Sequence, residues 1–166
     1  MRIADTLMQE LDMEAATTRR VLERVPDAQL GWKPAEKSRT LGQLAWHIAV
    51  NPGSVASLAA TTPAQMPNFG TDPSPKSAAE LLAALDDSVK SAKTVLAGMD
   101  DSAMTSMWTL MAGDAQVMTM PRIALFRTIM LNHWYHHRGQ LSVYLRQLGV
   151  PLPSIYGPSA DENPFM

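Results

Sequence analysis

Hydrophobic side chains recur at three- and four-residue steps over several long stretches of this chain. The first stretch covers residues 3–25, which contain no glycine or proline. Leu7, Leu11 and Leu22 recur within it at helical spacing. That spacing puts apolar side chains on one face of an α-helix. The pattern therefore predicts an amphipathic helix over this stretch, ended by Pro26.

Capping boxes mark the starts of two further predicted helices, because a hydroxyl residue is followed three positions later by Gln or Glu. The sequence TLGQ at residues 40–43 opens the first of them, and apolar positions continue to about residue 60. A Pro-Gly pair at residues 52–53 predicts a kink or a restart within this helix. The sequence SAAE at residues 77–80 opens the next helix, which runs toward Gly98 as its C-terminal cap.

The rest of the chain predicts one more long helix and two connecting segments. The helix is expected to begin at Pro121, a favoured first helical residue, and to end at Gly149. Residues 61–75 contain four prolines and predict a polar surface loop, while residues 104–120 predict either a small hairpin or an ordered loop. We therefore expect an all-α fold, a four-helix bundle with a short irregular or hairpin insert before the last helix.

Composition and charge narrow the class of protein. Of the 166 residues, 46% are hydrophobic and 18% are charged, which is typical of a globular chain, and we expect residues 1–166 to form a single domain. The net charge of −2 and the scattered basic residues argue against nucleic-acid binding. The sequence shows no signal-peptide core or membrane-spanning run, so we expect a soluble cytoplasmic protein that does not contact membranes.

The histidines have the most distinctive placement of any polar residue type. His47 lies in the second predicted helix, and His133, His136 and His137 lie in the last. Residues four apart are separated by about 40° around a helix, so His133 and His137 can reach one point, whereas His136 is turned about 100° from His137. With His47 from a neighbouring helix, the pair would form a three-imidazole metal site that keeps an open position. The chain has no cysteine, which excludes a thiolate site and a cysteine nucleophile.

The spacing alone leaves a second interpretation open. Two histidines four residues apart can arise by chance, and His47 lies between Trp46 and Ile48, a setting typical of a hydrogen-bonded core histidine. On this interpretation the protein is a helical interaction module that binds no metal.

Four segments resemble the DinB family, also called DinB/YfiT-like metalloenzymes. They are SRTLGQLAWHIA at residues 38–49, NHWYHHRGQL at 132–141, YLRQLG at 144–149 and PSIYGPSADE at 153–162. The resemblance implies a bundle of up-down-down-up connectivity, a homodimer, and a divalent ion held by three histidines. By position in the family motifs, those ligands are His47, His133 and His137, and His136 is the adjacent family histidine that is usually not a ligand.

A metal at such a site implies an enzyme. Zinc or nickel held by three imidazoles can act as a Lewis acid or activate water. The family resemblance also implies thiol-dependent transferases and isomerases, in which the metal lowers the pKa of a low-molecular-weight thiol. We therefore expect a metal-dependent transferase or hydrolase-like enzyme that acts on a small-molecule substrate with a thiol or water. The alternative is a non-catalytic dimeric helical protein that binds a metal or a small ligand.

Glu14 and Tyr144 are the candidate catalytic residues besides the histidines. Glu14 and Glu10, four apart on the first helix, would point a carboxylate toward the site as a base or as a hydrogen-bond partner of a ligand. Tyr144 would line the pocket two turns beyond the histidine pair. A solvated helix face and a core tyrosine are the alternatives for these residues. Arg138 is expected on the helix surface or at a dimer contact, with the binding of an acidic substrate as the alternative.

Overall fold

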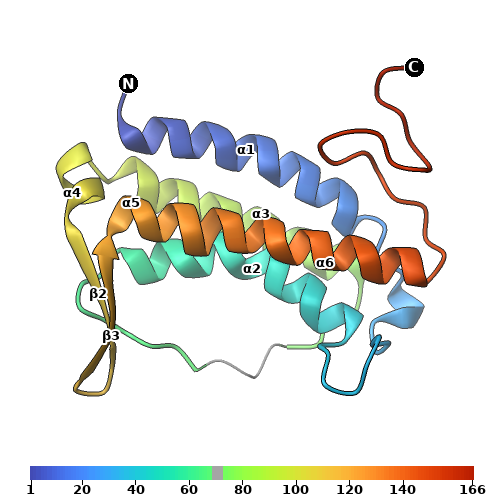
Figure 1. Ribbon diagram of the computed structural model, residues 1–166, viewed down its shortest axis with the longest axis horizontal. Coiled ribbons are helices and arrows are strands. Elements are labelled where there is room, and N and C mark those ends of the chain that lie inside the picture. The colour runs from blue at the N-terminus through green and yellow to red at the C-terminus, as the bar shows by residue number, and fades with distance from the viewer. Residues whose placement is uncertain (69–72) are drawn as a thin grey trace.

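Four long helical segments form the body of the protein in a computed structural model that describes residues 1–68 and 73–166 (Figure 1). They are α1 (Ile3–Leu22), α2 (Leu41–Ala59), α3 (Ala78–Ala97) and a final segment composed of α5 (Arg122–Leu125), a π-helical stretch (Phe126–Asn132) and α6 (His133–Gln147). The colours in Figure 1 show that α1 and the final segment run one way, and that α2 and α3 run the other. The expected up-down-down-up connectivity is therefore observed.

The capping residues set the helix starts. Thr40 accepts the backbone N–H of Gln43, and the Gln43 side chain accepts that of Thr40, so the first predicted capping box is confirmed. Ser77 caps α3 in the same way. The second box is only half formed, however, because the Glu80 carboxylate accepts the N–H of Lys76 instead.

The backbones of α2 and α3 approach each other closely at Gly53. Helix α2 continues through Pro52 without a restart, and Figure 1 shows that it bends, so the predicted kink is confirmed. The backbone N–H of Gly53 donates to the Ser88 hydroxyl at 2.8 Å. A Cβ atom at position 53 would lie 2.9 Å from the backbone of Ser88, so only glycine fits this crossing.

Gly53→Ala is therefore expected to lower the free energy of unfolding by about 1–3 kcal/mol, because the two backbones must move apart. The matched control is Gly139→Ala in α6, where an added Cβ meets nothing within 4 Å. That change should raise stability by roughly 0.5–1 kcal/mol through helix propensity. Urea unfolding measures both, and a Gly53→Ala protein as stable as the wild type would contradict the close approach.

A small sheet makes the all-α prediction wrong in part. Strands β1 (Ala64–Gln65), β2 (Met107–Ala112) and β3 (Ala115–Pro121) form a three-stranded sheet in that order. The antiparallel β2–β3 pair is the hairpin considered for residues 104–120, with Gly113 at the turn at φ +60°. Strand β1 pairs parallel with β2 inside the stretch expected to be only a loop, of which residues 69–72 lie outside the described residues.

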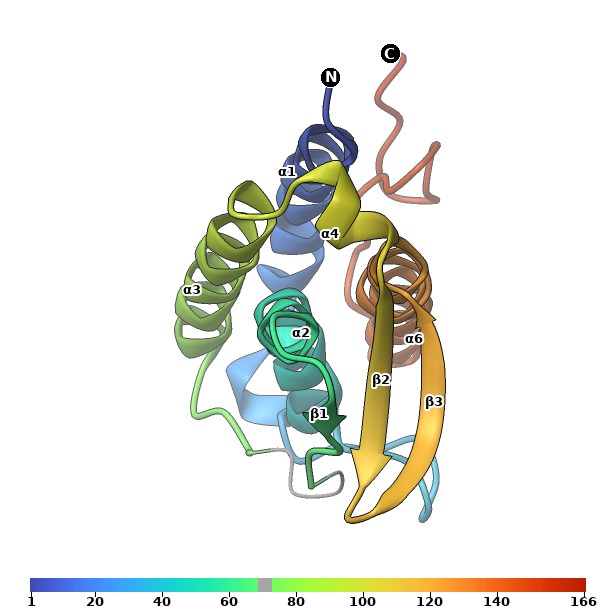
Figure 2. The ribbon, with the colours of Figure 1, turned by 90° about the vertical axis from the view of Figure 1, so that its left-hand side faces the viewer.

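The sheet lies at the end of the bundle that also carries α4 (Asp101–Thr105), as Figure 2 shows. Trp108 and Leu110 of β2 are buried, and the Trp108 indole donates to the carbonyl groups of Leu58 and Thr61. These bonds attach the hairpin to the end of α2. Among the described residues, no helix has the length and apolarity needed to span a membrane.

The last helical segment has the expected extent but not a uniform geometry. Pro121 is its N-cap and not its first helical residue, and Gly149 follows its end at φ +72°. Between α5 and α6, the backbone N–H of His133 bonds to the carbonyl of Thr128, five residues earlier. This π-helical stretch ends where the histidine-bearing helix begins.

Candidate metal centre

Three of the four histidines meet between α2 and α6. The Nε2 atom of His133 lies 3.0 Å from Nε2 of His47 and 3.1 Å from Nε2 of His137. The three rings cross at interplanar angles of 73° to 86°, so their nitrogen-bearing edges converge and do not stack. Three nitrogens bound to one tetrahedral zinc ion at about 2.0–2.1 Å would lie about 3.3 Å apart. The observed spacing is close to that of a ligand set.

The protonation of these histidines suits metal binding. Burial is the main cause that lowers the pKa of His137 to about 4, and burial likewise lowers the pKa of His133. Arg39, directly before the N-cap of α2, adds a positive charge that disfavours protonation of both rings. At neutral pH the two imidazoles are therefore uncharged and have lone pairs to offer.

Gln140 fixes the orientation of one of these rings. The Nδ1 atom of His137 lies 2.7 Å from the Gln140 side-chain oxygen, which can only accept a hydrogen bond. The ring proton therefore sits on Nδ1, and the lone pair of Nε2 faces the other histidines. Gln140 is not among the candidate site residues expected from the sequence, although its position three residues after His137 on the same helix places the two side chains within reach.

The fourth histidine does not take part. His136 is exposed, and its ring centroid lies 5.0 Å from that of His137. Among the described residues, the group of converging metal-ligand atoms comprises His47, His133 and His137.

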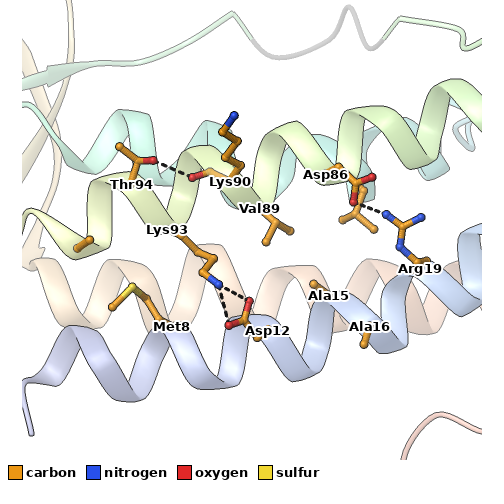
Figure 3. A pocket seen from close by; sticks show the side chains of 12 residues that line it. Met8, Asp12, Ala15, Ala16, Arg19, Asp86, Val89, Lys90, Lys93 and Thr94 are labelled. Atoms are coloured by element: carbon orange, nitrogen blue, oxygen red, sulfur yellow. Dashed lines mark hydrogen bonds and ion pairs between the residues drawn. The ribbon is translucent and has the colours of Figure 1, made fainter.

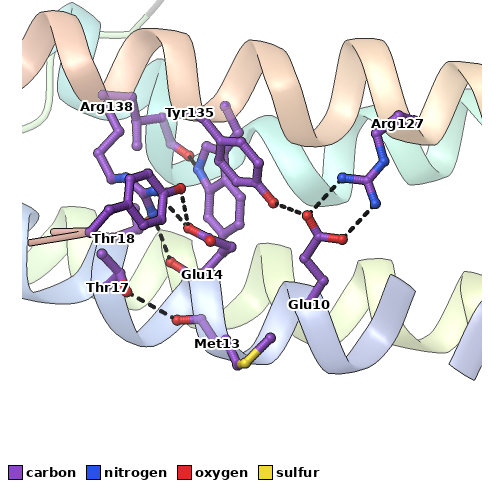
Figure 4. Close-up of polar contacts among 11 residues, drawn as sticks. Glu10, Met13, Glu14, Thr17, Thr18, Arg127, Tyr135 and Arg138 are labelled. Carbon is purple, nitrogen blue, oxygen red and sulfur yellow. Dashed lines mark hydrogen bonds and ion pairs between the residues drawn. The ribbon is translucent and has the colours of Figure 1, made fainter. Parts of the chain in front are cut away.

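The two carboxylates of α1 have other partners than the histidines (Figure 4). Glu10 accepts two hydrogen bonds from Arg127 at 2.7 and 2.6 Å and one from the Tyr135 hydroxyl at 2.8 Å. Glu14 forms an ion pair with Arg138 at 2.6 Å and accepts the Tyr156 hydroxyl at 2.9 Å. The structure thus engages Glu14 in an ion pair and does not bring it into the histidine group.

Arg138 is a buried residue, so its expected position on the surface or at a dimer contact is wrong. Its guanidinium lies 5.3 Å from the ring centroid of Tyr135 and 5.1 Å from that of Tyr156. It also donates to the Thr18 hydroxyl at 3.0 Å. With the Glu14 carboxylate, these partners compensate the guanidinium charge of a residue that is only 1% exposed.

Tyr144 contacts the segment that precedes α2. Its ring packs edge-on against Trp32 at 5.6 Å, and its hydroxyl lies 3.5 Å from the Arg39 carbonyl. These contacts fit the alternative of a half-buried packing residue. A catalytic role for Tyr144 stays a prediction.

One groove lies away from the histidines. It has a volume of about 610 Å³ and runs between α1 and α3 (Figure 3). Ion pairs join its two walls, Asp12 to Lys93 and Arg19 to Asp86. Because the lining contains no histidine and Asp12, Arg19, Asp86 and Lys93 are paired with one another, we place the chemistry at the convergent imidazoles and not at this groove.

Comparisons with known proteins identify the family and the fold. Residues 1–164 match the DinB family. Protein YrdA of Bacillus subtilis (strain 168), itself uncharacterised, is 28% identical over 161 residues, which is 95% of this chain and 90% of YrdA. A DinB-like protein from Bacillus cereus ATCC 10987 superposes with a TM-score of 0.74 at 25% identity, covering 92% of this chain and 97% of that one.

A second solved structure shares the fold at lower identity. YfiT from Bacillus subtilis has a TM-score of 0.65 and 19% identity, covering 88% of this chain and 87% of its own. That protein is described as a probable metal-dependent hydrolase with an unusual four-helix bundle topology.

Proposed function

This chain belongs to the DinB family, and we propose that it is a divalent-metal-dependent enzyme acting on a small molecule. The observation that carries the proposal is the convergence of three imidazoles, in which Nε2 of His133 lies 3.0 Å from Nε2 of His47 and 3.1 Å from Nε2 of His137. The description of the structurally similar YfiT as a probable metal-dependent hydrolase supports metal dependence.

In this proposal His47, His133 and His137 hold the ion through Nε2. Zinc and nickel are the ions we propose, since imidazole nitrogen suits both. Structural zinc sites usually have four protein ligands, whereas the described residues bring three together, which leaves a position for an exogenous molecule. A divalent ion held there supplies Lewis acidity, which lowers the pKa of a coordinated water or thiol.

The nucleophile must come from outside the chain if the reaction uses a thiol, because the sequence contains no cysteine. A low-molecular-weight thiol would make the protein an S-transferase, and water would make it a hydrolase. To test this, the metal-loaded protein is assayed with 1-chloro-2,4-dinitrobenzene and a panel of small thiols. Separate assays use activated esters. Thiol-dependent turnover above that of His137→Ala supports the transferase, and ester cleavage supports the hydrolase. If neither rate exceeds that of the variant, the non-catalytic metal- or ligand-binding alternative becomes the better account.

Replacing Gln140 tests the ligand geometry directly. Gln140→Leu removes the acceptor for His137 Nδ1–H and should weaken zinc binding by about 10–100-fold, as loss of such a partner typically does. Gln140→Glu keeps an acceptor and should retain tight binding. The exposed Gln147 provides the control, as Gln147→Leu on the same helix should bind like the wild type. Competition with a chromophoric chelator measures each affinity, and equal values for the two leucine variants would refute this role.

Assembly and location remain predictions. The family resemblance implies a homodimer, and a cytoplasmic location stays a prediction from the sequence. Sedimentation velocity on the purified chain distinguishes a dimer near twice the 18.1 kDa chain mass from a monomer.

A further inference from the structure

Two buried hydrogen bonds join α2 to the last helical segment beside the histidines. The Trp134 indole N–H donates to the carbonyl of Ile48 at 2.8 Å. The Asn51 side-chain amide donates to the carbonyl of Met130, also at 2.8 Å. Ile48 directly follows His47 in the sequence, and Trp134 directly follows His133. The bonds therefore connect the backbones that carry His47 and His133, whose Nε2 atoms lie 3.0 Å apart.

The first bond exists because of the proline within α2. In a regular helix the carbonyl of Ile48 would accept the N–H of residue 52, but Pro52 has none. The freed carbonyl is buried in the bundle and needs a donor. The indole of Trp134, only 1% exposed, supplies it. A residue unfavourable to the helix thus creates an attachment point for α6.

The second bond ends within the π-helical stretch. Met130 belongs to that stretch. The side chain of Asn51, which is 5% exposed, reaches the Met130 carbonyl from the opposite helix. Short π-helical stretches are frequent at functional sites because they change the rotation of the residues that follow. Here the next residue is His133, the histidine whose Nε2 approaches both others.

We propose that Trp134 and Asn51 are positioning residues that hold α2 against the last helix, so that His47 and His133 present their Nε2 atoms to one metal ion. This inference rests on the proposed function, since it assigns the two bonds to the same metal site. Metal affinity depends steeply on ligand placement, and residues that fix ligand orientation typically contribute 10–100-fold to it.

The test compares two buried tryptophans that both donate to backbone carbonyls of α2. Trp134→Phe removes the bond beside the histidines, and Trp108→Phe removes the bonds at the far end of α2. Each variant, without a histidine tag, is assayed for zinc affinity by chelator competition and for thermal stability in the metal-free state. Cobalt(II) absorption spectra report the ligand geometry. Asn51→Leu is the second variant, and it carries the test if Trp134→Phe does not fold.

We expect both tryptophan variants to melt at lower temperature than the wild type. Only Trp134→Phe and Asn51→Leu should weaken zinc binding, by about 10–100-fold, and alter the cobalt spectrum. If Trp134→Phe or Asn51→Leu binds zinc as tightly as Trp108→Phe does, the bonds serve stability alone and the inference is overturned. A wild-type protein that binds no metal would instead contradict the proposed function, so the two failures are distinguishable.

Discussion

His137→Ala is expected to reduce zinc affinity by more than the roughly 100-fold that loss of an outer hydrogen-bond partner costs. The variant removes one of three converging Nε2 atoms, and the two that remain cannot enclose the ion. His47→Ala should have an equally large effect. The His47 nitrogen comes from α2, and the two histidines of α6 cannot supply a ligand from that side of the ion.

His136→Ala is the matched control for this experiment. It changes the same residue type on the same helix, one position away, but its exposed ring lies outside the converging group. Chelator competition on the three untagged variants should give wild-type affinity for His136→Ala alone. Equal affinities across all three would show that the convergence of the imidazoles does not bind metal.

Glu14→Ala is expected to lower the free energy of unfolding by about 3–5 kcal/mol, the largest stability effect we predict. The side chains of Arg138 and Glu14 are only 2% and 13% exposed, so water cannot replace the lost carboxylate. The variant leaves a guanidinium charge buried between two tyrosine rings without its counter-ion.

The control for Glu14→Ala lies two residues earlier on the same helix. Asp12 pairs with Lys93 at the surface, where the side chains are 53% and 41% exposed. Asp12→Ala should therefore cost about 0–1 kcal/mol. Urea unfolding at neutral pH measures the stability of both variants. A Glu14→Ala protein no less stable than Asp12→Ala would mean that the Arg138 guanidinium becomes hydrated when its partner is lost.

The helices could be predicted from the sequence because their signals are local. Apolar periodicity and the box at Thr40 and Gln43 act within one or two turns, and the structure contains those helices. The convergence of His133 and His137 also follows from spacing on one helix. Spacing does not establish His47 as the third ligand, because that depends on which helices are neighbours; a bundle makes it possible, and the family resemblance supports it.

The remaining features depend on tertiary partners. Strand β1 has two residues and exists only because β2 lies beside it, so no pattern in residues 61–75 could reveal it. The burial of Arg138 requires Glu14 from α1 and Tyr156 from the C-terminal segment. The π-helical stretch has no sequence signature, and its bond from Asn51 becomes visible only when the helices are packed.

The most direct test of the central claim is the metal content of the untagged wild-type protein, measured by elemental analysis after purification without chelators. A histidine tag is omitted because it would itself bind metal. We predict about one equivalent of zinc or nickel per chain, as expected for a single three-histidine site. No stoichiometric metal, even after incubation with zinc, nickel or manganese and removal of excess, would contradict the account and leave a helical interaction module as the better description.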